Sequence, residues 1–101
     1  DHNYVTDGYN MAEIREIAAA RSEKTGIHME VLTDCPCVQF YAGNFVDNEK
    51  GKNGHVYGKR NGFCLETQVE PNAVNVPDFH SPILNKGEKY YSETVYRFSA
   101  K

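Results

Sequence analysis

Turn-forming residues divide this chain into many short segments, and that division constrains the fold more than any other feature of the sequence. Four dipeptides are typical of tight turns: Gly43-Asn44, Asn53-Gly54, Asn61-Gly62 and Lys86-Gly87. The clearest strand signals between these turns are residues 29–32, 38–41, 63–66 and 94–98. In the last of these, Thr94, Tyr96 and Phe98 alternate with more polar residues, which predicts that they face a core. The pattern predicts an all-β protein.

The segment 11–22 is ambiguous. It holds Ala, Glu and Arg, which are strong helix formers, and Ile14, Ile17 and Ala18 recur at helical spacing. The same segment leads into Lys24-Thr25-Gly26 and then 27–31, which is typical of a hairpin turn and its return strand. Local sequence therefore leaves helix and strand equally open. Further along, three prolines, Pro71, Pro77 and Pro82, predict a long irregular connection over 68–87.

Composition excludes several classes of protein. A chain of 101 residues that is 40% hydrophobic is expected to form one domain, spanning residues 1–101. Its apolar stretches are far shorter than the ~20 residues of a membrane helix, so we expect no membrane partner. Eleven Lys and Arg against fourteen Asp and Glu give no excess of positive charge, which argues against a nucleic-acid partner.

Cysteine use favours a reducing, cytoplasmic setting. Cys35, Cys37 and Cys64 form an odd set, and no Asn-X-Ser/Thr glycosylation signal occurs. Cys35-Pro36-Cys37 could bind metal or cycle between redox states, but its spacing is not that of zinc or thioredoxin-like motifs. We therefore expect these two cysteines to fill a turn or the core.

Two polar residues stand inside apolar runs. Glu66 ends an apolar stretch. Desolvation there would raise the pKa of its carboxylate, which could then act as a general base. The alternative is a surface Glu at a strand end. Gln39 lies between aromatic and β-branched residues. There its amide could form hydrogen bonds with sugar hydroxyls, and the neighbouring rings could pack against the apolar face of a pyranose. A Gln on the outer face of a strand is the other interpretation.

The histidines do not predict a metal site. His2, His28, His55 and His80 are far apart, and none shares a short motif with cysteine or paired carboxylates. We expect no metal and no other cofactor.

Several motifs together resemble the aldose 1-epimerase (galactose mutarotase) family. In chain order they are Asp1-His2-Asn3-Tyr4-Val5, Met29-Glu30-Val31-Leu32-Thr33, Val38-Gln39-Phe40-Tyr41-Ala42-Gly43-Asn44-Phe45, Gly51-Lys52-Asn53-Gly54, Gly62-Phe63-Cys64-Leu65-Glu66-Thr67-Gln68, Pro71-Asn72-Ala73-Val74-Asn75 and the closing 87–99. The resemblance covers nearly the whole chain and corresponds to the last third of the family's length. It implies an antiparallel β-sandwich, part of a larger supersandwich, in which 11–21 is a strand paired with 27–33.

The resemblance also implies an activity and a site. Family members interconvert the α and β anomers of aldohexoses such as galactose and glucose. The family's catalytic base falls on Glu66, and its sugar-binding aspartate and glutamine fall on Asp1 and Gln39. The reaction needs only proton transfers, so no cofactor is implied.

One part of the family's machinery has no counterpart in this sequence. The acid histidine of the family lies upstream of the matched motifs, and none of the four histidines here occupies its position. His80 also departs from the family, which more often has proline there. The chain is therefore expected to need an N-terminal part of the same enzyme as its partner, and to be inactive alone. A non-catalytic carbohydrate-binding module and a self-associating fragment are the alternatives.

Overall fold

The computed structural model describes residues 1–10 and 13–100. In that part of the chain the regular structure is β-strand, with short 3-10 turns and no longer helix. The strands are β1 His2–Val5, β2 Arg15–Arg21, β3 Ile27–Thr33, β4 Cys37–Tyr41, β5 Glu49–Lys50, β6 Val56–Tyr57, β7 Cys64–Gln68 and β8 Thr94–Ala100. The 3-10 turns are η1 Lys52–Gly54 and η2 Ala73–Asn75.

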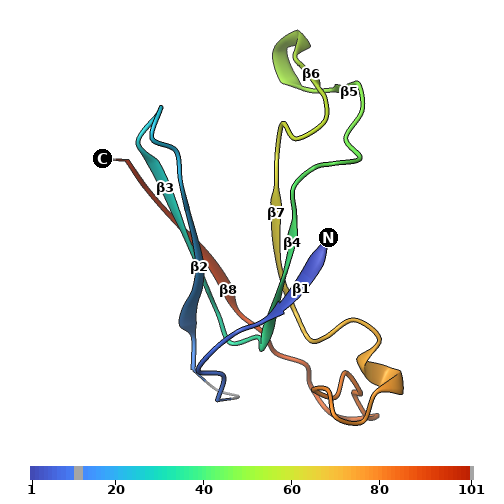
Figure 1. Ribbon diagram of the computed structural model, residues 1–101. Coiled ribbons are helices and arrows are strands. Elements are labelled where there is room, and N and C mark those ends of the chain that lie inside the picture. Colours follow the sequence, from blue (N-terminus) through green and yellow to red (C-terminus); the bar gives the residue numbers. More distant parts are fainter. Residues whose placement is uncertain (11–12, 101) are drawn as a thin grey trace.

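Two three-stranded antiparallel sheets form the body of the molecule. One has the strand order β1-β4-β7 and the other β2-β3-β8 (Figure 1). The hairpin of β5 and β6 stands apart at the far end of β4 and β7 (Figure 1). The predicted all-β, antiparallel fold class is confirmed.

The ambiguous segment forms a strand. β2 pairs with β3 through a turn at Gly26, whose φ of +74° is accessible at little cost to glycine. A β-bulge between Glu16 and Ala18 shifts the register part-way along. Pairing with a neighbouring strand therefore outweighs the helix propensity of the alanines. The expected strand began at residue 11. The observed strand begins at Arg15, because residues 13 and 14 are not part of the pairing, and residues 11 and 12 lie outside the described part of the chain.

The two sheets meet at a cluster of three threonines. Thr94 Oγ1 on β8 lies 3.1 Å from Thr33 Oγ1 on β3 and 2.6 Å from Thr67 Oγ1 on β7. Thr33 is fully buried and also donates to the carbonyl of Glu93. Val31 and Cys37 are the other fully buried side chains, so the core is small and centred on this junction.

Away from that junction the sheets diverge. A cleft of about 600 Å³ separates them, and its apolar walls include Ala18 on β2, Phe40 on β4 and Leu65 on β7. Tyr96 and Phe98 of β8 were expected to face a core. The Tyr96 hydroxyl donates to the carbonyl of Leu65 on β7 at 2.7 Å, but the diverging sheets leave the two side chains 47% and 65% exposed. The radius of gyration is 16.4 Å, against about 13 Å for a compact domain of this length.

The connection between β7 and β8 is irregular, as its prolines predict, and a hydrogen bond between the buried Glu70 and the part-exposed His80 anchors it. Glu70 is 7% exposed and accepts from the backbone N–H of His80, while its Oε1 lies 2.9 Å from His80 Nδ1. The His80 ring in turn meets Tyr9 edge-on, at 4.8 Å between centroids. Burial alone would raise the pKa of Glu70, but hydrogen bonds from its own backbone and from His80 outweigh burial and lower it.

No helix in the described part of the chain is long and apolar enough to cross a membrane.

The Glu70–His80 pair predicts a pH-dependent contribution to stability. Because the pKa of Glu70 is lower in the folded state, its carboxylate stabilises the fold above the ordinary pKa of 4.5, and this contribution is lost as pH falls through the folded-state value. Glu70→Gln should lower the free energy of unfolding by about 1.5–3 kcal/mol at pH 7, the range for hydrogen bonds to charged groups. Urea denaturation at several pH values measures this.

The exposed Glu88, whose carboxylate accepts from Asn85, provides the matched control. Glu88→Gln should change stability by less than about 0.5 kcal/mol, as surface substitutions usually do. An equal effect of the two substitutions, or a Glu70→Gln deficit that persists unchanged below pH 4, would contradict the anchoring role.

Candidate functional site

The register of the β1-β4-β7 sheet brings polar residues from three strands together. Gln39 at the middle of β4 lies directly opposite Asn3 on β1 and directly opposite Glu66 on β7. Directly opposed residues project to the same side of a sheet, with Cβ atoms roughly 5 Å apart. Asp1 and Gln68, each two residues from a member of this row, fall on the same side by alternation. We call Asp1, Asn3, Gln39, Glu66 and Gln68 the polar face.

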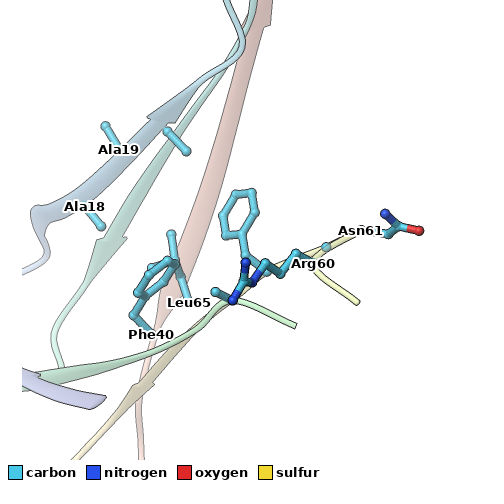
Figure 2. A pocket seen from close by; sticks show the side chains of 10 residues that line it. Ala18, Ala19, Phe40, Arg60, Asn61 and Leu65 are labelled. Carbon is cyan, nitrogen blue, oxygen red and sulfur yellow. The ribbon is translucent and has the colours of Figure 1, made fainter. Parts of the chain in front are cut away.

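The opposite side of the same sheet is apolar. Phe40 and Leu65 line the cleft between the sheets, and Figure 2 shows them across from Ala18 and Ala19 of β2. Arg60 and Asn61 lie at one end of that cleft (Figure 2). The polar face is therefore turned away from the β2-β3-β8 sheet, on the outer side of the molecule.

Glu66 is exposed, and the expectation that its apolar neighbours desolvate it is wrong for this structure. Phe63 and Leu65, which flank it in sequence, project to the other side of the sheet, because successive strand residues point to opposite faces. The structure does place Glu66 beside Gln39, across the β4–β7 pair.

Gln39 is half-buried, and its side-chain oxygen has a partner. Gln68 Nε2 donates to Gln39 Oε1 at 3.0 Å and to Asn3 Oδ1 at 2.9 Å. This arrangement joins β1, β4 and β7 through their side chains as well as their backbones. Asn3 and Gln68 were not singled out from the sequence, although their spacing of two from Asp1 and Glu66 could have indicated a shared face.

Asp1 directly precedes β1 and is exposed. Alternation places it on the same side as Asn3, at the end of the polar face nearest Tyr41 and Cys64, which oppose each other across β4 and β7. It therefore lies two residues along the chain from the row of Asn3, Gln39 and Glu66.

The cysteines behave as two classes. Cys35 and Cys37 are buried and unbridged, as expected for core residues, whereas Cys64 is exposed. Burial raises the pKa of the Cys37 thiol; a hydrogen bond with Asn3 opposes this, and the nearby charge of Glu70 adds to it. Cys37 is therefore a neutral thiol at pH 7. No cluster of three or more possible metal ligands occurs among the residues described.

None of the four histidines is a cross-strand neighbour of Glu66. His2 opposes Phe40, so it projects to the side opposite Gln39. His28 lies on the other sheet, with Nε2 3.8 Å from Glu30, and His80 is held by Glu70. His55 is exposed beside the β5–β6 hairpin. The polar face thus carries two carboxylates and several amides. A carboxylate can accept a proton, and both kinds of group can bind hydroxyl groups.

Comparison with known proteins identifies relatives along almost the whole chain. The aldose 1-epimerase family matches residues 1–97. Galactose mutarotase of Homo sapiens is 47% identical over 100 residues, which cover 98% of this chain and 29% of that protein. Galactose mutarotase of Mus musculus is 45% identical with the same coverage, and aldose 1-epimerase of Escherichia coli K12 is 34% identical over 77 residues. The chain spans less than a third of the length of these relatives.

Thiol reactivity tests the geometry of the site. Titration of the native protein with Ellman's reagent should modify Cys64 and spare Cys37, because the reactive thiolate requires access and Cys37 is a buried neutral thiol. Peptide mass spectrometry assigns the modified positions, and Cys64→Ser should remove the fast phase. Modification of Cys37 as fast as Cys64 would contradict the described packing.

Proposed function

This chain belongs to the aldose 1-epimerase family, and on that premise we propose that it is the C-terminal part of a mutarotase acting on aldohexoses such as galactose and glucose. The observation that carries the proposal is the direct opposition of Glu66 and Gln39 on an exposed polar face, in a chain whose relatives are galactose mutarotases. Three side chains there can meet a pyranose: the Glu66 carboxylate, the Gln39 amide and the Asp1 carboxylate.

Glu66 acts as the general base in this proposal. Its carboxylate takes the proton from the anomeric hydroxyl while the ring C–O bond breaks and an acid protonates the ring oxygen, which gives the open-chain aldehyde. Rotation about the first C–C bond presents the other face of the carbonyl. Ring closure then reverses both proton transfers, so atoms and protons balance without a redox step.

Asp1 and Gln39 bind the sugar. A carboxylate accepts hydrogen bonds from hydroxyl groups, and an amide can donate to them or accept from them. Gln39 is the cross-strand neighbour of Glu66, and Asp1 is on the same side of the sheet. In this proposal the two residues hold the anomeric centre against the base and reduce the entropy cost of reaching the transition state.

The acid comes from outside this sequence. We infer that a histidine of an N-terminal part of the same enzyme protonates the ring oxygen, since no histidine described here neighbours Glu66 across the strands. The same part would cover the polar face and fill the apolar cleft, which explains why Glu66, Tyr96 and Phe98 are so exposed in this chain. Covering Glu66 would supply the desolvation that a general base needs.

A cytoplasmic setting fits this assignment. Cys35 and Cys37 are free although close in sequence, and the third cysteine is exposed and unpaired, as in proteins of reducing compartments.

The base assignment is tested by Glu66→Gln in the full-length protein. Turnover, followed by polarimetry of freshly dissolved α-D-galactose or α-D-glucose, should fall by at least ~10²-fold, the usual contribution of a general base. Glu49→Gln, an exposed carboxylate on β5, is the matched control and should keep its turnover. Near-normal mutarotation in Glu66→Gln would remove Glu66 from this role.

The need for the N-terminal part is tested with the 101-residue chain itself. It should not accelerate mutarotation above the buffer rate, because it lacks the acid. Acceleration that disappears in Glu66→Gln would show that the chain is sufficient. Galactose binding by calorimetry without acceleration would favour the alternative of a non-catalytic carbohydrate-binding module.

A further inference from the structure

Gln68 on the polar face has no proposed contact with the sugar, but it holds Gln39, which is proposed to bind the sugar. The side-chain amide of Gln68 has two N–H hydrogens, and both are directed to carbonyl oxygens: Asn3 Oδ1 at 2.9 Å and Gln39 Oε1 at 3.0 Å. Gln68 on β7 therefore donates two hydrogen bonds, one to β1 and one to β4.

This contact decides which end of the Gln39 amide is available to a ligand. A primary amide is planar, with its oxygen and its NH2 group on opposite sides of the carbonyl carbon. Because Gln39 Oε1 accepts from Gln68, the NH2 group points away from Gln68 and is the end left to face the site. A flipped Gln39 would lose this hydrogen bond, because its NH2 group would then meet the NH2 group of Gln68.

The two hydrogen bonds of Gln68 fix its own direction as well. Asn3 on β1 and Gln39 on β4 both accept from the same amide nitrogen of Gln68. A reversed Gln68 amide would present its oxygen to both partners, so Asn3 and Gln39 would both have to reverse with it.

We propose that Gln68 is a positioning residue for sugar binding, which holds Gln39 so that its NH2 group donates to a sugar hydroxyl oxygen beside Glu66. This inference rests on the proposed mutarotase function and deepens it. In this arrangement the sugar hydroxyl that contacts Gln39 accepts a hydrogen bond through its oxygen. The hydrogen of that hydroxyl is then donated to a different group.

Gln68→Leu in the full-length protein tests the proposal. Leucine keeps the approximate volume of glutamine but cannot donate, so Gln39 loses its fixed orientation while Glu66 remains in place. The KM for galactose should rise ~5–10-fold, the scale of one or two net hydrogen bonds, while kcat changes less than about twofold. Gln68→Met, a flexible isostere, should likewise raise KM and leave kcat nearly unchanged. It replaces the leucine variant in this test if that variant does not fold.

A double-mutant cycle separates positioning from general stability. If Gln68 acts through Gln39, Gln68→Leu should raise KM much less in a Gln39→Ala background than in the wild type. Asn75→Leu is the matched control: it removes another amide–amide hydrogen bond, to Asn72 at 2.6 Å, outside the sheet. It should leave KM unchanged.

The outcomes distinguish the two proposals. Unchanged KM in both Gln68 variants, or effects of Gln68→Leu and Gln39→Ala on KM that simply add, would overturn the positioning role even while Glu66→Gln remains inactive. A lowered melting temperature with unchanged KM would likewise overturn it and leave Gln68 a structural residue. Absence of mutarotation in the wild-type protein would instead overturn the proposed function.

Discussion

The backbone register between β4 and its two neighbours is the constraint on which the rest of the structure depends. It sets Asn3, Gln39 and Glu66 in one row across three strands. Side chains alternate along a strand, so a slip of one residue would put Phe40 and Leu65 in their place and turn the polar residues into the cleft. The apolar cleft side, closed at one end by the threonine junction, therefore fixes which side of the sheet the polar face occupies, and the hydrogen bonds of Gln68 to Asn3 and Gln39 join its strands further.

Much of the fold could be predicted from the sequence because its strands are marked locally. The turns and the β-rich segments around β3, β4 and β8 follow from residue type and alternation. Arg15–Arg21 could not be decided in this way, because its alanines favour a helix and only pairing with β3 makes it a strand. The resemblance to a family supplied that information, which periodicity did not contain.

The site was less predictable, because it depends on which way side chains point and on contacts between residues far apart in the sequence. The position of Glu66 beside Gln39 depends on pairing residues 27 apart in sequence, and its exposure depends on which way Leu65 points. Gln68 contacts Asn3 across 65 residues, so no local pattern could reveal their hydrogen bond. Glu70 and His80 form their hydrogen bonds inside a connection that the prolines marked only as irregular.

We propose that the outer face of the β1-β4-β7 sheet presents a carboxylate and an oriented amide to a sugar, and that an acid from another part of the enzyme completes the site. A crystal structure of the full-length protein with galactose bound tests it most directly. The account predicts a pyranose on the polar face, with a Glu66 carboxylate oxygen within hydrogen-bond distance of the anomeric oxygen and the Gln39 nitrogen on a neighbouring hydroxyl. A sugar bound elsewhere, or Glu66 turned away from its anomeric carbon, would contradict it.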